Sequence, residues 1–247
     1  MKLFPILVAS VAIAASAACS AEKDKAPTQV ASAPVKPVAP PASGDWSEVV
    51  SATPEGGFLM GNPAAAVKLV EFGSFTCSHC AEFSEKSNKA LTENYVKSGR
   101  VSFELRSYMR NGLDIAATLI AACNGPKSFF PIAHAMYGAQ ADWLGRVASD
   151  AARQEAIANL PPAQQFAGFA KLAGLDSFAA MRGVPSAKSA KCLADEAAVS
   201  KLVQQTSDAT SQYNIPGTPT FLINGEVVKD TAAWELLEPR LKVALGG

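Results

Sequence analysis

Apolar and polar positions alternate in two different ways along the chain, one typical of strands and one of helices. Val67 to Phe72 is β-branched and apolar apart from Lys68 and Glu71, which predicts a buried strand. A helical pattern begins near Cys77 and runs toward Tyr95. The residues from Val101 to Arg106 then alternate like a half-buried strand. Strand, helix and strand in succession favour a right-handed parallel unit.

The middle of the chain, from about Gly112 to Ser207, has a helical pattern throughout. Apolar residues recur at helical spacing and are separated by turn residues such as Gly125-Pro126 and Pro161-Pro162. We expect several helices, the last of them long, beginning near Ser186 and carrying Cys192.

A strand pattern returns near the end of the chain. Pro219 to Ile223 predicts a strand, Asn224-Gly225 is a strong hairpin signal, and Glu226 to Val228 is its partner. Asp230 or Thr231 is a candidate cap for a final helix that runs through Leu241 to Leu245. The expected order is therefore β-α-β, a helical insertion, and β-β-α.

The N-terminal residues predict export. Met1-Lys2 precedes an apolar run from Leu3 to Ala18 that is short and rich in alanine, as in a signal peptide of residues 1–18. A buried N-terminal core helix is the alternative. Ser16 to Cys19 resembles a lipobox, which makes Cys19 a candidate lipidation site, although Ser16 stands where an aliphatic residue is usual. Ordinary cleavage after Ala17 or Ala18 is the alternative.

Residues 19–45 are rich in alanine and proline and contain no aromatic residue, which predicts a disordered tether. The residues after the tether are enough to form one large hydrophobic core, because 49% of the 247 residues are hydrophobic. We divide it into residues 46–110 and 206–247, which form the two parts of one α/β fold, and a helical insertion at 111–205. The formal net charge is zero and basic residues do not cluster with aromatic ones, so nothing indicates nucleic acid.

The chain has five cysteines, at positions 19, 77, 80, 123 and 192. If Cys19 carries a lipid, four remain in an environment where disulfides persist. Cys77 and Cys80 are neighbours on an expected helical turn. That leaves Cys123 and Cys192 as a second pair, either bridged across the insertion or present as two buried free thiols.

The segment Cys77-Ser78-His79-Cys80 lies where a strand ends and a helix begins. The N-terminus of a helix offers unpaired N–H groups and a positive dipole end, both of which stabilise a thiolate on Cys77. A protonated or hydrogen-bonding His79 would add to this effect. A metal site and a purely structural disulfide are the alternatives. However, zinc usually requires a second close pair of ligands, and a two-residue loop restrains the unfolded chain very little.

The stretch LVEFGSFTCSHCAEF, from Leu69 to Phe83, resembles the active-site segment of the DsbA-like branch of the thioredoxin superfamily. Gly61-Asn62-Pro63 before the strand, Ala122-Cys123 and Gly217-Thr218-Pro219 fit the same pattern. The resemblance extends from about Val49 to Leu245, and this order of elements is far more specific than a CxxC motif alone.

This resemblance implies an α/β thioredoxin fold interrupted by a helical domain, with Cys77 as nucleophile and Cys80 as the buried resolving cysteine. It also implies a cis peptide bond before Pro219, with Thr218 presenting its backbone to the substrate. Ser78 stands where proline is frequent, and this departure puts the oxidising strength in doubt.

Glu71 lies six residues before Cys77. In thioredoxin-like proteins an acid at this position accepts a proton from the second cysteine, and the alternative is a carboxylate that faces solvent. His134 is expected to be packed or at the surface, not a ligand. The aromatic residues Phe129, Phe130, Phe166, Phe169 and Phe178 are expected to form the core of the insertion.

The function that the resemblance implies is a periplasmic dithiol oxidase that forms disulfides in exported, cysteine-containing polypeptides. It needs no bound cofactor and implies reoxidation by a quinone-linked membrane partner. A reductase or isomerase of the same fold is one alternative. A redox-inert binding module or metal carrier is another, from a different class of protein.

Overall fold

The structure, a computed structural model, describes residues 39–247. The expected signal peptide, the candidate lipidation site Cys19 and most of the expected tether lie outside the described residues. Among residues 39–247, no helix is both long enough and apolar enough to cross a bilayer.

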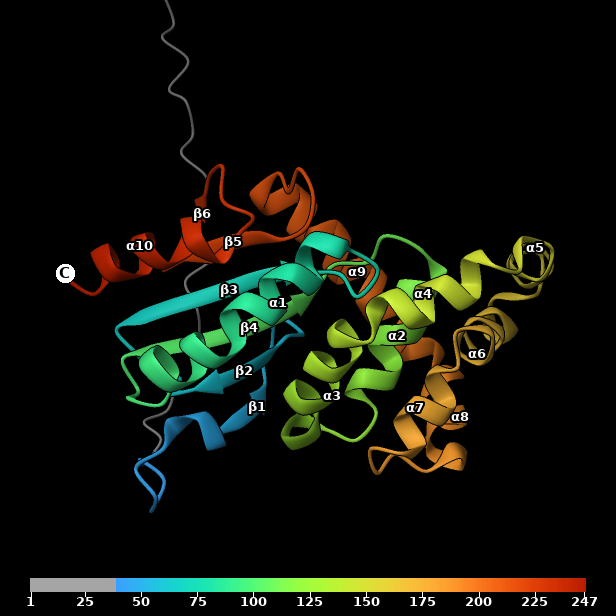
Figure 1. Ribbon diagram of the computed structural model, residues 1–247, viewed down its shortest axis with the longest axis horizontal. Coiled ribbons are helices and arrows are strands. Elements are labelled where there is room, and N and C mark those ends of the chain that lie inside the picture. The colour runs from blue at the N-terminus through green and yellow to red at the C-terminus, as the bar shows by residue number, and fades with distance from the viewer. Residues whose placement is uncertain (1–38) are drawn as a thin grey trace, which may run out of the picture. The chain divides into compact units, whose positions relative to one another are not determined.

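A six-stranded mixed sheet forms one side of the described part of the chain, and most of the helices between β4 and β5 lie beside it on the other (Figure 1). Its strands lie in the order β1-β2-β4-β3-β5-β6. Their bounds are β1 Val50–Ala52, β2 Phe58–Gly61, β3 Val67–Gly73, β4 Val101–Ser107, β5 Thr220–Ile223 and β6 Glu226–Val228. β3 pairs with β4 in parallel and with β5 antiparallel, so the expected parallel unit and the late strand are both confirmed. β3 therefore lies inside the sheet with a partner on each side.

The hairpin between β5 and β6 is also confirmed. Asn224 and Gly225 have φ angles of 52° and 89°, the left-handed values that a tight two-residue turn requires.

The helices follow in chain order as α1 Ser78–Ala90, α2 Gly112–Ala122, α3 Pro126–Gly138, α4 Gln140–Ala148, α5 Ala151–Ala158, α6 Pro162–Ala173, α7 Leu175–Ala180, α8 Ser186–Leu193, α9 Glu196–Tyr213 and α10 Trp234–Ala244. A single 3₁₀ turn, Trp46–Glu48, precedes β1, and α1 continues as a π-helix over Leu91–Val96. All helices from α2 to α9 lie between β4 and β5 in the sequence.

Three details differ from the sequence-based predictions. The single long helix from Ser186 is wrong, because α8 ends at Leu193, and Asp195 then caps a new helix, α9, by accepting a hydrogen bond from the N–H of Ala198. The capping of the last helix is also wrong, because α10 begins after Ala233 with no side-chain cap. Strands β1 and β2 were not predicted, since three or four residues are too few to show a period.

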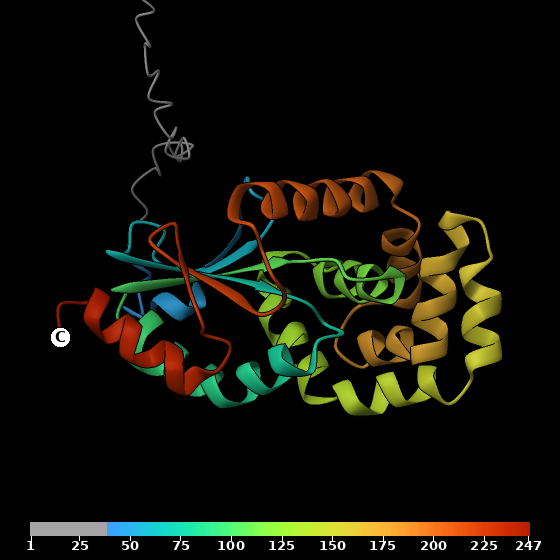
Figure 2. The ribbon, with the colours of Figure 1, turned by 90° about the horizontal axis from the view of Figure 1, so that it is seen from above.

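Alternation along β3 decides which side chains face which layer. Val70 and Phe72 pack in a small cluster with residues of α9, whereas Val67 and Leu69 belong to the main core that includes α1. Figure 2 shows α9 along one face of the sheet and α1 with α10 along the other. Glu71 shares the parity of Leu69 and therefore points into the layer that holds α1.

The aromatic residues of the helical segment are buried or partly buried, but two of them contact the sheet as well. Phe129 stacks on Phe58 of β2 with ring centroids 3.9 Å apart, and Phe130 lies 5.7 Å from Phe103 of β4. The expectation that all five form a core internal to the insertion is therefore wrong for these two, because α3 packs directly on the sheet.

Candidate active site

Cys77 is the N-cap residue of α1, at the point where the loop after β3 turns into the helix. Ser74 begins this turn, since its carbonyl accepts a hydrogen bond from the N–H of Cys77 at 3.1 Å. The N–H groups of the first helical turn have no partners within the helix, so the sulfur of an N-cap cysteine lies beside uncompensated donors.

The surroundings of Cys77 lower its pKa from 9.0 to about 4. The largest cause is a hydrogen bond from the Cys80 thiol, and the Thr218 side chain and the backbone N–H groups of Cys80 and His79 act in the same direction. Burial opposes them. The donors outweigh burial, so the thiolate is the stable form at neutral pH.

Cys80 lies one helical turn further on, in surroundings of the opposite kind. Its side chain is 0% exposed, against 6% for Cys77. Burial raises the pKa of Cys80 well above 9.0, and its hydrogen bond to Cys77 and the charges of Glu71 and Cys77 raise it further. Both cysteines are free thiols in this structure. The pair therefore consists of one thiol that ionises easily and one that stays protonated.

The peptide bond between Thr218 and Pro219 is cis and lies directly before β5. Because β5 pairs with β3, the segment before it reaches the end of the sheet where α1 begins. The Thr218 carbonyl, 3.1 Å from the Cys77 sulfur, places this segment against the thiol that ionises.

Glu71 is 3% exposed and lies in the layer between β3 and α1. Burial raises its pKa from 4.5 to about 8, with a smaller contribution from the charge of Cys77. Its Oε1 atom has no hydrogen-bond partner among the described residues. The structure therefore does not place Glu71 in solvent, and it brings a protonated carboxyl near both cysteines.

A cavity of about 30 Å³ adjoins Glu71 between α1 and α3, large enough for about two water molecules. Tyr137 lines it on the inner side, and Ser84 and His134 line it on the outer side. A Cβ atom at Gly73 would lie 2.9 Å from Glu71 Oε1 and 3.1 Å from the Tyr137 hydroxyl oxygen, so these two oxygens face the same point.

The two histidines lie at the surface. The His79 side chain is 71% exposed and its Nδ1 lies 3.9 Å from Glu82. The backbone N–H of His79 is among the groups that lower the pKa of Cys77, and a contribution of its ring stays a prediction. His134 is exposed and its Nδ1 pairs with the Ser84 hydroxyl at 3.1 Å. No cluster of three or more His, Cys, Asp or Glu side chains among residues 39–247 could hold a metal ion.

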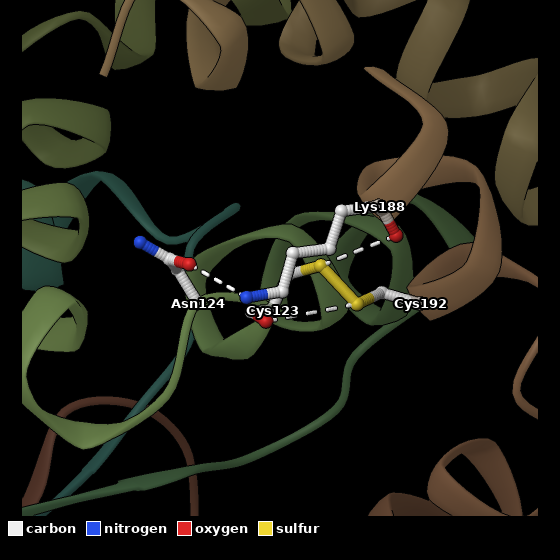
Figure 3. The surroundings of a disulfide bond; sticks show 4 residues. All are labelled: Cys123, Asn124, Lys188 and Cys192. Carbon is white, nitrogen blue, oxygen red and sulfur yellow. Dashed lines mark hydrogen bonds between the residues drawn. A yellow bond between two sulfur atoms is a disulfide. The ribbon is translucent and has the colours of Figure 1, made fainter. Parts of the chain in front are cut away.

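Cys123 and Cys192 form a disulfide that closes 69 residues and joins the end of α2 to α8 (Figure 3). Lys188, one turn before Cys192, donates from its amino group to the side-chain oxygen of Asn124, the residue after Cys123, at 2.6 Å. The bridge thus fastens α8 to α2.

Sequence analysis missed three buried residues of the helical segment that adjoin the cysteines. Asp114 of α2 accepts a hydrogen bond from the N–H of Thr76, and Gln140 of α4 donates to the active-site loop. Burial raises the pKa of the Tyr137 hydroxyl well above 10.0, and the negative charge of the Cys77 thiolate acts in the same direction. Burial raises the pKa of Asp114 to about 6. Of these three residues, only Asp114 lies within a pattern that is visible in the local sequence. It lies three residues after Asn111, which caps α2 by accepting a hydrogen bond from the N–H of Asp114.

Residues 53–242 match the family model described as thioredoxin. The chain belongs to the thioredoxin family. A solved structure from Novosphingobium aromaticivorans, described as a protein-disulfide isomerase, is 35% identical, with a TM-score of 0.73 over 76% of this chain and 97% of that one. The α-DsbA1 structure from Wolbachia pipientis is 18% identical, with a TM-score of 0.63 over 81% of this chain and 96% of that one, and shows the same fold.

A protein of Rickettsia bellii, provisionally named a protein-disulfide oxidoreductase, is 24% identical over 172 residues, or 69% of this chain. This chain spans 58% of its length, and 52% and 54% of two further Rickettsia relatives. The resemblance to DsbA-like thiol-disulfide oxidoreductases and the predicted fold class, an α/β thioredoxin fold with inserted helices, are thus confirmed.

Proposed function

We propose that this member of the thioredoxin family is a periplasmic dithiol oxidase, which introduces disulfides into exported proteins through a mixed disulfide on Cys77. The observation that carries the proposal is the contrast between the two thiols. The pKa of Cys77 is lowered to about 4 and that of Cys80 is raised well above 9.0. A stable Cys77 thiolate stabilises the reduced protein, and a disulfide whose reduced form is stable is a strong oxidant.

In the proposed reaction, the Cys77–Cys80 disulfide is the oxidant. A substrate thiolate attacks the Cys77 sulfur, the Cys77–Cys80 bond breaks, and Cys80 leaves with the electron pair. The second substrate thiolate then attacks the substrate sulfur of the mixed disulfide, and Cys77 leaves as its thiolate. The substrate has lost two electrons and gained a disulfide, and the enzyme holds a thiolate and a thiol.

We assign Glu71 as the group that gives a proton to the departing Cys80 sulfur. A thiolate on Cys80 is costly because the side chain is fully buried, so its departure requires a proton. The Glu71 carboxyl is protonated at neutral pH, since its pKa is about 8, and it lies close enough for its charge to influence Cys80. In the reverse direction the same carboxylate accepts the proton of Cys80.

The cis segment supports the assignment of the substrate site. The Thr218 carbonyl touches the Cys77 sulfur, so a substrate cysteine bonded to Cys77 would lie beside the backbone of Thr218 and Pro219. Hydrogen bonds between the substrate main chain and the backbone at Thr218 do not depend on substrate side chains, so they would hold substrates of different sequence.

Trapping of the mixed disulfide tests this function. The probe is a peptide with a single cysteine, activated as a mixed disulfide with glutathione: the Cys77 thiolate attacks the peptide sulfur and glutathione leaves as its thiolate. A Cys80→Ser variant lacks the resolving thiol, so it should remain linked to this peptide. A Cys77→Ser variant should form no link. Equal trapping by both variants, or trapping by neither, would contradict the assignment of roles.

A disulfide isomerase or reductase is the second candidate, favoured by the 35% identical relative that is described as a protein-disulfide isomerase. Refolding of a scrambled four-cysteine protein distinguishes the two. An oxidase restores activity poorly from scrambled disulfides but rapidly from reduced protein, and an isomerase does the reverse.

The proposed location rests on the N-terminal sequence, and the proposed partner rests on the family resemblance. Residues 1–18 are the proposed signal peptide, and Cys19 is the proposed lipid attachment site that would tether the protein to a membrane. Return to the disulfide form requires an oxidant, for which we propose a quinone-linked membrane protein. Metabolic labelling with a lipid precursor tests the anchor, since a Cys19→Ala variant labelled as strongly as wild type would exclude it.

A further inference from the structure

Gln140, the first residue of α4, is a buried amide that contacts the active-site loop. Its side-chain nitrogen donates to the carbonyl of Phe75 at 2.7 Å and to the carbonyl of Cys77 at 2.9 Å. Both amide hydrogens are thereby used, and the residue is only 6% exposed. One side chain therefore holds the backbone at Cys77 and two residues before it.

The Cys77 carbonyl is also part of α1. It accepts the first hydrogen bond of the helix, from the N–H of Ala81 at 3.2 Å. Gln140 is its second donor. The stability of the Cys77 thiolate depends on the N–H groups of His79 and Cys80 in the same turn. The orientation of these donors relative to the sulfur therefore depends on the backbone that Gln140 fixes.

The bonds of Gln140 also have an electrostatic effect. A carbonyl oxygen carries partial negative charge, and the two oxygens that Gln140 binds belong to Cys77 itself and to Phe75, two residues before it. An amide N–H bonded to each oxygen partly offsets that charge, and this effect is stronger in a buried site than in water. Removal of the two donors should therefore make the Cys77 thiolate less stable.

A second set of contacts holds the middle of the loop. The N–H of Thr76 donates to Asp114 Oδ1 at 3.3 Å, and Arg110 donates to the Thr76 carbonyl at 3.2 Å. These bonds anchor the loop to the start of α2, so the loop remains attached when Gln140 is replaced. Asp114 and Arg110 are charged groups, whereas Gln140 is neutral and its removal changes no charge.

We propose that Gln140 is a positioning residue for the redox site, which stabilises the Cys77 thiolate by binding the carbonyls of Phe75 and Cys77. The helical segment thus contributes directly to the reactivity of the thiol. The inference rests on the proposed function, because it assigns to Gln140 a share of the low pKa on which that function depends.

The test compares three variants of the full chain. Gln140→Met removes both donors at nearly constant volume and without a charge, and Gln140→Glu adds a negative charge at the same place. Gln165→Glu is the matched control. Gln165 likewise donates from one amide nitrogen to two carbonyls, those of Ala158 and Leu160, but it lies in α6 and binds the end of α5 and the loop after it. Thermal unfolding establishes that each variant is folded.

The readout is the Cys77 thiolate pKa, followed by ultraviolet absorbance and by the pH dependence of alkylation. Glu71 and Asp114, the carboxyls nearest the thiols, are present in every variant, so a difference reports on position 140. We expect Gln140→Met to raise the pKa by about one unit, which makes alkylation about fivefold slower at the wild-type midpoint. Gln140→Glu should raise it further, and Gln165→Glu should leave it unchanged.

The results separate the two proposals. A low pKa in wild type that Gln140→Met leaves unchanged would overturn the role of Gln140 and leave the proposed function standing. If Gln140→Glu does not fold, Gln140→Met alone decides. An ordinary thiol pKa in wild type, near ~8.5, would contradict both proposals. An equal shift in Gln165→Glu would also overturn the role of Gln140, because it would show a general effect of added charge.

Discussion

Cys77 and Cys80 are three positions apart on one helical turn, yet their environments move their pKa values in opposite directions. Cys77 lies at the N-terminal end of α1, where backbone N–H groups without partners in the helix face the sulfur. Cys80 lies one turn further along α1, where burial disfavours charge. The CxxC spacing and its place between a strand and a helix made this contrast predictable from the sequence. The spacing does not show which way the exposed His79 ring points, so its contribution stays a prediction.

The low pKa of Cys77 predicts how the stability of the reduced protein depends on pH. Between about pH 4 and pH 9, folding releases the Cys77 proton, so stability rises with pH over this window. The gain is complete above the unfolded pKa and is lost as the pH falls through about 4. The oxidised protein has no Cys77 proton to release. As the pH falls from 7 to 4, the Tm of the reduced protein should therefore decrease relative to the Tm of the oxidised protein.

Calorimetry of both redox forms across this range measures the effect. The Cys77→Ser variant is the control, because its Tm should lack this pH-dependent component. A reduced protein whose Tm relative to the oxidised form is constant from pH 7 to pH 4 would contradict the assigned thiolate.

Glu71 gives a prediction of opposite sign. Its pKa is raised from 4.5 to about 8, so the folded protein holds a proton that the unfolded chain loses in this window. The buried carboxyl therefore destabilises the protein as the pH rises from about 5 to 8. Glu71→Gln should increase stability at pH 7 by about 3 kcal/mol and slow the release of Cys80.

Urea denaturation at pH 5 and pH 7 measures the stability change, and stopped-flow exchange measures the rate. Glu226→Gln, at an exposed glutamate of β6, is the control. A Glu71→Gln variant less stable than wild type at pH 7, with an unchanged exchange rate, would exclude both the buried-proton account and the role in exchange.

At the scale of elements, the parts with strong local signals were predicted and the parts held by distant contacts were not. β3, α1, β4 and the Asn224-Gly225 hairpin each follow from a pattern within about ten residues. The break at Asp195 was missed because apolar spacing continues on both sides of it. Gln140 and Asp114 were missed because the loop residues that they bind are 63–65 and 38 positions away in the sequence.

The disulfide between Cys123 and Cys192 joins two such elements, α2 and α8. Because it closes 69 residues, it removes many conformations from the unfolded chain and should stabilise the fold by up to about 4 kcal/mol. A Cys123→Ser, Cys192→Ser double variant should lose most of this stability in urea denaturation. The reduction potential of Cys77 and Cys80 should stay the same. A loss below ~1 kcal/mol would contradict a structural role.

At the scale of the whole described chain, the site is assembled from segments that lie far apart in the sequence. β3 supplies Glu71, α1 supplies the cysteines, and the segment before β5 brings Thr218 and Pro219 against Cys77. Gln140 at the start of α4 holds the loop between β3 and α1. The family resemblance predicted the first three of these contributions, because they belong to the shared fold. It gave no indication of the contribution of α4.

The direction of electron flow is the central claim, and the reduction potential of the Cys77–Cys80 pair tests it most directly. The protein is equilibrated with glutathione buffers, and the Cys123→Ser, Cys192→Ser variant keeps the second disulfide from contributing. A stabilised Cys77 thiolate predicts an oxidising pair, with a potential near or above about −150 mV. A potential near or below about −230 mV would place the protein among reductants and contradict the proposed function.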